Sequence, residues 1–477
     1  MTNPSPTKSA GGNFRWVICG LLFLSVAVNY IDRNIIGILK MPLSKELGWS
    51  ETDYAHIASA FSFSYAFGYL FGGRIMDWIG VKRGLPIFVF LWSVAAIAHG
   101  LCTYLPHDST FSMNIPWFTG TIPFLVPMTA LGFMSARIML GLAEGGNFPG
   151  AIKTVAEWFP VRERALSTGI FNAGTNVGAV VCPLSVPIMY KLWGWPVTFY
   201  VTGALGFAWL VLWWWLYDAP EKHRHLKPAE LQYIQSDQPP TVEKPKAPSW
   251  LSLLGSRAIW GLLSPGRLSK EEIGVEFRRA RAVWAYLFAS TLAGPVWTIY
   301  MFFLPDFLDK RYHVPLEQIG WWTAVFYFIA AFGGIAGGWL SGKLIGMGWT
   351  LNAARKISLL LCAVAVIPLF VAPYLNNIWL TVIIVGIAGS AHQGWSANLF
   401  SFVSDTMPKK AVGAVVGFGG FVAYFAGGIV AELIGIQLKQ KGNYVLVFGC
   451  ASLMYIISVT VLHFLVPKIQ QVDQPNK

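Results

Sequence analysis

The chain has 477 residues, of which 55% are hydrophobic and 12% are charged. A water-soluble domain usually carries about 25% charged residues, so this composition excludes an ordinary soluble protein and indicates an integral membrane protein. The formal net charge of +12 would suit a nucleic-acid-binding protein, but the distribution of the basic residues between loops orients a membrane protein and requires no polyanion.

The sequence contains roughly twelve apolar stretches that are long enough to cross a bilayer, since a spanning helix needs about 20 apolar residues. The first stretch is too long for a cleavable signal peptide and has no small-residue cleavage site, so we expect it to remain as a span. The predicted spans are residues 15–40, 56–78, 84–104, 122–147, 165–190, 193–217, 282–308, 320–345, 353–374, 378–404, 411–437 and 443–466.

The loops between these spans differ in charge. When the N-terminus is placed in the cytoplasm, most of the 35 Lys and Arg residues fall on the cytoplasmic side, as the positive-inside rule requires. This predicts cytoplasmic positions for both termini. Residues 107–124 separate the third and fourth spans by more than a tight turn, and we expect a partly apolar loop there on the outer side.

The longest polar interruption, residues 218–281, divides the spans into two sets of six. Its stretch "QPPTVEKPKAPS" is typical of a flexible linker, while "WLSLLGSRAIWGLL" and "KEEIGVEFRRARA" are typical of short amphipathic helices on a membrane surface. We therefore expect an N-terminal six-helix bundle over 1–217, a cytoplasmic linker over 218–281 and a C-terminal six-helix bundle over 282–477. Two equivalent bundles with a site between them suit alternating access.

The first and fourth predicted spans each carry two charged residues well inside their apolar sequence, where charge is rare and costly. Asp32 and Arg33 are adjacent in the first span, so on a helix they point about 100° apart and need separate partners. Arg137 and Glu144 lie two helical turns apart on one face of the fourth span. The four charges sum to zero, so we expect one buried network that joins the two spans.

Two interpretations of this network stay open. It is either a fixed salt bridge between spans one and four, or a site for a proton and an anion. A buried carboxyl group resists losing its proton, and a nearby guanidinium favours the loss. Arginine also grips a carboxylate with two hydrogen bonds. In the second interpretation Arg33 binds a substrate, while Asp32, Arg137 and Glu144 couple its binding to protonation.

Other polar or aromatic side chains within spans are candidates to line a cavity for a hydroxylated ligand. Each of them taken alone is more often a helix-packing residue, but the set favours a polar ligand such as a sugar. The candidates that we assign to substrate binding, besides Arg33, are Tyr65, Asn172, Asn176, Gln393, Trp395, Asn398 and Tyr424.

The turn after the second span, "GGRIMDWIGVKRG", is expected on the cytoplasmic side. We expect its residues Gly73, Asp77, Gly80, Lys82 and Arg83 to latch neighbouring helices at an inner gate, although ordinary orienting charge is the alternative. The chain has no HExxH motif, no metal-ligand cluster and no phosphate-binding loop between a strand and a helix. We therefore expect no metal, no cofactor and no enzymatic activity.

"GGRIMDWIGVKRG" resembles the cytoplasmic signature of the major facilitator superfamily. "NYIDR", "RIMLGLAEGGNFPG" and "EWFPVRERALSTGIFNAGTNVGA" resemble its anion:cation symporter family, and "HQGWSANLFSFVSDTMPKKAVGAVVGFGG" resembles the hexuronate transporter branch. The resemblance implies twelve transmembrane helices in two pseudo-symmetric bundles, and proton-driven uptake of organic anions across a bacterial inner membrane. It also implies a monomer that needs only its substrate, protons and the lipid bilayer as partners.

Carried over by position, the resemblance assigns carboxylate binding to Arg33, protonation to Asp32 and Glu144, pairing with these to Arg137, and a substrate-proximal place to Tyr65. One departure stands out. Related hexuronate-type proteins often have Asp before the proline of span seven and a basic residue four positions earlier, where this chain has Gly294 and Ser290. We predict a symporter for a hexuronate such as glucuronate or galacturonate. The alternative is an exchanger or facilitator for another organic anion, an aldonate or a phosphorylated sugar.

Overall fold

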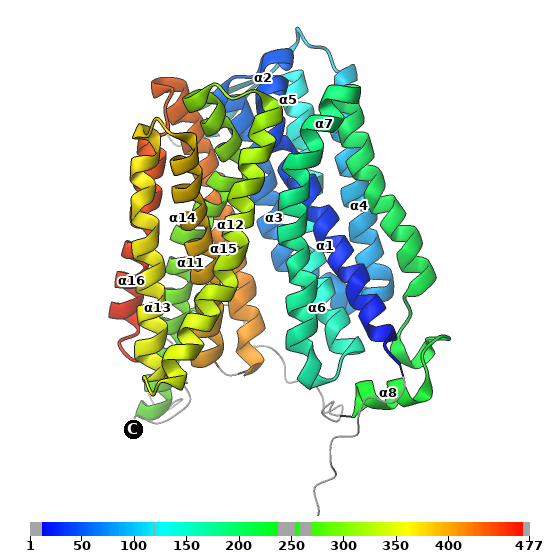
Figure 1. Cartoon of the computed structure of the whole chain (residues 1–477), viewed down its shortest axis with the longest axis vertical. Coiled ribbons are helices and arrows are strands. Elements are labelled where there is room, and N and C mark those ends of the chain that lie inside the picture. The colour runs from blue at the N-terminus through cyan, green and yellow to red at the C-terminus, as the bar shows by residue number, and fades with distance from the viewer. Residues whose placement is uncertain (1–11, 118–119, 237–252, 257–268, 408, 471–477) are drawn as a thin grey trace, which may run out of the picture. The chain divides into compact units, whose positions relative to one another are not determined.

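The computed structural model describes residues 12–117, 120–236, 253–256, 269–407 and 409–470. This part of the chain is helical almost throughout (Figure 1). Its α-helices are α1 (Phe14–Ile38), α2 (Lys40–Leu47), α3 (Glu51–Ile79), α4 (Val81–Leu101), α5 (Met128–Glu144), α6 (Asn147–Trp158), α7 (Val161–Leu216), α8 (Pro228–Gln235), α11 (Lys270–Tyr312), α12 (Leu316–Gly346), α13 (Leu351–Val366), α14 (Ile378–Thr406), α15 (Lys409–Lys441) and α16 (Val445–Leu465). Short 3-10 turns are η1 (Cys102–Tyr104), η2 (Pro220–Lys222) and η3 (Ile367–Tyr374).

Nine stretches of the described chain are long and apolar enough to cross a membrane. One of them, Ser167–Leu216, has 50 residues and is broken at Gly194, whose φ of 77° and ψ of 172° are not helical, so it accounts for two crossings. The 29-residue α3 and the consecutive helices α5 and α6 supply the remaining two. This tally agrees with the twelve predicted crossings.

The chain forms two compact units. The first comprises Met1–Ile36 and Phe67–Lys244, and the second comprises Gly37–Ala66 and Pro245–Lys477. The corner made by the end of α1, by α2 and by the first half of α3 is therefore grouped with the C-terminal helices. Our predicted boundaries at residues 217 and 281 follow the order of spans along the chain, and they stay a prediction.

Small residues let the helices pack closely within each unit, as is usual where no water drives association. In the first unit α3 meets α5 so tightly that a Cβ on Gly145 would lie 2.4 Å from the backbone of Gly68. In the second unit α12 lies along α14 (Figure 1), and a Cβ on Gly337 would lie 2.4 Å from the Cα of Gly394. These glycines fix helix separation near the polar groups described below.

A β-hairpin precedes α5, where we predicted a loop and the start of the fourth span. Strands β1 (Thr110–Trp117) and β2 (Gly120–Pro127) pair antiparallel, with Thr110 opposite Pro127. The predicted start of that span at residue 122 is wrong, because residues 122–127 belong to β2. An apolar run alone does not separate strand from helix, but the prolines at 123 and 127 are poorly suited to a helix interior.

The linker is described only in part. The stretch "QPPTVEKPKAPS" and most of "WLSLLGSRAIWGLL" lie outside the described residues. "KEEIGVEFRRARA" is not a separate surface helix but the beginning of α11, which continues into the seventh span. Ser269 and Glu272 form a capping box that starts this helix.

A buried cluster of opposite charges holds the corner of residues 37–66 within the second unit. The Lys40 Nζ lies 2.7 Å from a carboxylate oxygen of Glu51 and 2.7 Å from one of Asp306, and the Lys310 Nζ lies 3.1 Å from the other oxygen of Asp306. Tyr444 donates a hydrogen bond to Asp306 as well. The side chain of Lys40 is 3% exposed and that of Asp306 is 6% exposed, so each charge depends on its neighbours for compensation. No local sequence pattern indicated this cluster, because its residues are far apart in the chain.

Replacing Asp306 by Asn should destabilise the protein strongly, because it leaves Lys40 and Lys310 to share the single carboxylate of Glu51. We expect a loss of about 3–5 kcal/mol, measured as a fall of the thermal unfolding midpoint in detergent. Asp405→Asn is the matched control, because its bridge to Arg355 at 2.8 Å is more exposed and is worth about 1 kcal/mol or less. Equal shifts for the two variants would contradict this ranking.

Candidate functional site

The four charged residues predicted to form a network in spans one and four lie together in the first unit. The Arg33 Nε on α1 donates to the Glu144 Oε2 on α5 at 3.0 Å, and both side chains are at most 1% exposed. The Arg137 Nη1, on the same face of α5, donates to the backbone carbonyl of Arg33 at 3.3 Å. The two-turn spacing on α5 thus places one charged side chain on the guanidinium of Arg33 and the other on its backbone.

Asp32 is buried beside this pair but is not part of its hydrogen bonding. It is 2% exposed, and neither carboxyl oxygen has a hydrogen-bond partner among the described residues. The nearby hydroxyl of Thr202 donates instead to the carbonyl of Phe199 at 3.3 Å. An ionised carboxylate without hydrogen bonds is very costly to bury, whereas a protonated carboxyl group is much less so. The surroundings of Asp32 therefore suit a group that holds a proton.

Three residues around the network were not singled out in the sequence. Asn29 accepts a hydrogen bond from the Arg33 Nη2 at 2.9 Å, and the ring of Tyr30 lies 4.8 Å from the guanidinium carbon of Arg33. On α4, His99 is buried, stacks on Phe199 at 5.0 Å and has its Nδ1 2.7 Å from the Ala95 carbonyl. Asn29 and Tyr30 stand inside the "NYIDR" motif, and the i to i+4 spacing of Asn29 and Arg33 was the signal available.

Four of the predicted substrate-binding residues are two asparagines on α7 in the first unit and two tyrosines in the second unit, and they differ in burial. Asn172 is exposed and Asn176 is half-buried, one turn apart on α7. In the second unit the rings of Tyr65 on α3 and Tyr424 on α15 lie 4.3 Å apart. Tyr65 is buried and Tyr424 is half-buried, so the structure brings these two predicted residues together.

Two of the three predicted substrate-binding residues on α14 are fully buried and contact neighbouring residues. Gln393 is half-buried, whereas Trp395 is fully buried and packs edge-on against Tyr455 at 5.3 Å. The Asn398 amide donates to the carbonyl of Gly337 at 3.0 Å and to that of Gly394 at 2.9 Å. These contacts favour the helix-packing alternative for Trp395 and Asn398, and their role in binding stays a prediction.

The predicted gate residues surround the tight turn between α3 and α4. Gly80 forms this turn with a φ of 77°, which favours glycine; Gly73 and Asp77 lie on α3 before it, and Arg83 is exposed on α4 after it. The Lys82 Nζ lies 2.7 Å from the Asp218 Oδ2, just beyond α7. Burial tends to raise the pKa of Asp218, but the hydrogen bonds from Lys82 and from the Ala219 backbone N–H, together with the charge of Lys82, outweigh it and hold the pKa below its usual range. The turn is thus tied to other helices of its own unit.

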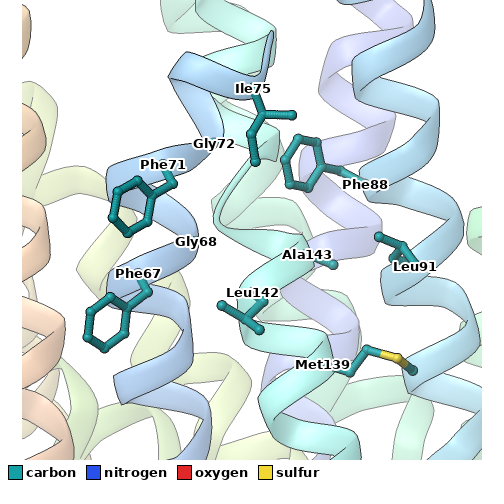
Figure 2. A pocket seen from close by; sticks show the side chains of 10 residues that line it. All are labelled: Phe67, Gly68, Phe71, Gly72, Ile75, Phe88, Leu91, Met139, Leu142 and Ala143. Atoms are coloured by element: carbon teal, nitrogen blue, oxygen red, sulfur yellow. The ribbon is translucent and has the colours of Figure 1, made fainter. Parts of the chain in front are cut away.

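An apolar groove with a volume of about 360 Å³ also lies in the first unit, between α3, α4 and α5 (Figure 2). Its walls carry Phe67, Phe71, Phe88 and Leu142, and it contains none of the predicted site residues. A groove without polar groups does not suit a hydroxylated anion. Among the described residues no three His, Cys, Asp or Glu side chains gather as a metal ion would require.

A sequence model of the Major Facilitator Superfamily matches residues 22–431. The chain is 27% identical to the hexuronate transporter of Escherichia coli strain K12 over 431 residues, which cover 90% of this chain and 88% of that protein. It is 27% identical to the probable galactarate/D-glucarate transporter of the same strain over 456 residues, covering 94% and 95%. It is also 24% identical to the D-galactonate transporter of Escherichia coli O6:H1 over 459 residues, covering 94% of each.

Solved structures agree with the fold. The D-xylose-proton symporter matches with a TM-score of 0.66 at 14% identity, covering 98% of this chain and 100% of that one. A bacterial homologue of the human lysosomal transporter Spinster, in an inward-facing and occupied conformation, matches with a TM-score of 0.65 at 15% identity, covering 96% and 98%. These matches and the helix tally confirm the predicted all-α fold with twelve transmembrane helices.

The bridge between Arg33 and Glu144 should show as energetic coupling. Glu144→Leu leaves the buried guanidinium without its carboxylate, so we expect a loss of about 3–5 kcal/mol. The double variant Arg33→Met, Glu144→Leu removes both charges and should be more stable than Glu144→Leu alone. Thermal unfolding in detergent of the two single variants and the double variant measures the coupling. Simple addition of the two single effects would show that the side chains do not interact.

Proposed function

The chain belongs to the major facilitator superfamily, as its motifs predicted, and from this premise we propose that it is a proton-coupled symporter that imports a sugar acid by alternating access. Membership makes it a multi-pass membrane transporter and not an enzyme. A hexuronate such as glucuronate or galacturonate is the first candidate substrate, supported by the relatives that are named as hexuronate, galacturonate and galactonate transporters.

The observation that carries this proposal is the salt bridge between Arg33 and Glu144 beside Asp32, whose buried carboxyl oxygens have no hydrogen-bond partner among the described residues. A substrate carboxylate and Glu144 are chemically alike, so they compete for the same guanidinium. Protonation of Glu144 removes its charge and weakens its hold on Arg33, which favours binding of the substrate anion. In this cycle Arg137 holds the backbone of Arg33 in place from the same helix as Glu144.

Asp32 is a second carboxyl group in the same site that can carry the proton. With Glu144 ionised and paired, Asp32 is the carboxyl group whose surroundings best tolerate a proton. A proton that moves between the two carboxyl groups would decide whether Arg33 is occupied by Glu144 or by substrate. Coupling is then a linkage of binding free energies, because proton and anion each raise the affinity for the other. Both leave together when the bundles change their access.

The seventh span departs from the hexuronate-type pattern, and this departure bears on the choice of substrate more than on the mechanism. Between residues 282 and 305, α11 has no charged residue. Gly294 stands where hexuronate-type relatives often have Asp, and a Cβ there would lie 2.6 Å from the Cβ of Ala423 on α15. The close packing of α11 on α15 thus replaces a charge. A dicarboxylate such as galactarate would find no cation on α11 for its second carboxylate, whereas hydroxyl groups are served by tyrosine and amide side chains.

The remaining expectations complete the proposal. The protein works as a monomer in the inner membrane of a bacterium, with both termini in the cytoplasm, and the proton gradient drives it without a cofactor. The turn with Asp77 and Lys82 then lies at the inner gate. The second candidate is an exchanger or facilitator for an aldonate, favoured by the relative named as a D-galactonate transporter, or for a phosphorylated sugar.

Purified protein in proteoliposomes should accumulate labelled glucuronate above its outside concentration when an inward proton gradient is imposed. Unlabelled hexuronates and aldonates should compete, and galactarate should compete at least about tenfold more weakly, because binding a second carboxylate without a cation is costly. Exchange without accumulation would instead establish the exchanger. Stronger competition by galactarate would overturn the preference for one carboxylate.

Glu144→Gln should abolish accumulation that depends on the proton gradient while keeping exchange of labelled for unlabelled substrate. The neutral amide cannot keep Arg33 from the substrate as a carboxylate does, so substrate binding no longer depends on a proton at this position. Uptake and counterflow in the same vesicles separate the two activities. If Glu144→Gln still accumulates substrate against its gradient, Glu144 is not the coupling residue.

A further inference from the structure

A buried amide beside the Arg33–Glu144 bridge has a donor group that no part of the proposed cycle uses. Asn29 lies on α1 one turn before Arg33 and is 3% exposed. Its Oδ1 accepts a hydrogen bond from the Arg33 Nη2 at 2.9 Å. Its Nδ2 is buried and has no hydrogen-bond partner among the described residues. Buried amide groups in native proteins are nearly always satisfied, so this one calls for an explanation.

The chemistry of arginine fixes which way the Asn29 amide points. A guanidinium carries only donors, so the oxygen of the amide has to face it. Because the oxygen and the NH₂ group share one carbon and one plane, the NH₂ group then lies beside the guanidinium and cannot donate to it. Asn29 cannot turn over to satisfy its NH₂ without losing the bond to Arg33 and placing two donors against each other. The unused donor is therefore a consequence of the bond to Arg33.

The guanidinium of Arg33 has neighbours on three sides. Glu144 accepts from its Nε, Asn29 accepts from its Nη2, and the ring of Tyr30 lies 4.8 Å from its central carbon. A substrate carboxylate that takes the place of Glu144 brings two oxygens, with about four acceptor sites between them. Arg33 satisfies some of these sites, and the remaining oxygen needs a donor close by.

We propose that Asn29 binds the substrate carboxylate directly, together with Arg33. Its Oδ1 keeps the guanidinium oriented, and its Nδ2 donates to the carboxylate oxygen that Arg33 leaves unsatisfied. Because the amide is neutral, this donor is present whether or not Asp32 and Glu144 carry a proton. Asn29 therefore adds affinity for the anion without taking part in proton coupling. This inference rests on the proposed function, since it needs a carboxylate substrate at Arg33.

The test compares uptake kinetics of Asn29→Leu with those of wild type in proteoliposomes. We expect the KM for glucuronate to rise about tenfold or more, as for loss of a hydrogen bond to a charged group, with the maximal rate within about threefold. Asn147→Leu is the matched control. Asn147 is also 3% exposed and accepts a hydrogen bond from Ser25 on α1 at 2.9 Å, but neither residue belongs to the Arg33 site.

The inference is overturned if Asn29→Leu keeps the wild-type KM, or if Asn147→Leu raises the KM equally. Should Asn29→Leu fail to fold, Asn29→Ala decides the question, because it removes the amide donor without adding a charge that would itself compete for Arg33. A wild-type KM in Asn29→Ala would also reject the donor role, while a rise of tenfold or more would support it. If the wild-type protein transports no sugar acid, the proposed function itself is rejected. The results for the Asn29 variants bear only on the role of Asn29 and do not test that function.

Discussion

The buried guanidinium of Arg33 is the constraint on which the first unit depends. A charge inside the apolar layer of a membrane protein is tolerated only with a partner of opposite charge and with its donors satisfied. Glu144 supplies the charge, and Asn29 accepts from a second nitrogen. The close approach of α3 to α5, where Gly145 lies against Gly68, helps to fix the position of the helix that carries Glu144. Helix packing and charge compensation are therefore one requirement.

A second buried ionic cluster has its charges fully compensated, unlike the network around Arg33. Around Asp306, two lysines face two carboxylates and a tyrosine hydroxyl adds a further hydrogen bond. Around Arg33, by contrast, one carboxylate is paired, while the neighbouring Asp32 and the NH₂ group of Asn29 have no hydrogen-bond partner in the part of the chain that the structure describes. An incompletely satisfied polar network is costly to keep. It makes physical sense where a proton and a ligand complete it during the cycle.

The sequence predicted the network but not its surroundings, for a physical reason. Helical periodicity places Arg137 and Glu144 on one face, and the cost of burying charge demands a partner, so Arg33 follows. The cluster of Lys40 with Asp306 joins residues far apart in the chain, and no local pattern indicates which distant helix will receive a lysine. The β-hairpin before α5 was missed because an apolar run with prolines has no period that separates it from a span. Asn29 was missed because an unused donor shows only in three dimensions.

The residues of the buried charged network and the residues proposed to select the substrate lie in different parts of the chain. All four network charges come from α1 and α5, whereas α11 has exchanged a charge for close packing at Gly294 against Ala423. Under the proposed function, a change at position 294 bears on which anion is accepted and leaves the competition between Glu144 and the substrate for Arg33 unchanged. In that proposal the coupling chemistry and the choice of anion rest on different helices. Because only the first requirement is imposed by the cost of buried charge, substrate specificity is the property that is free to diverge.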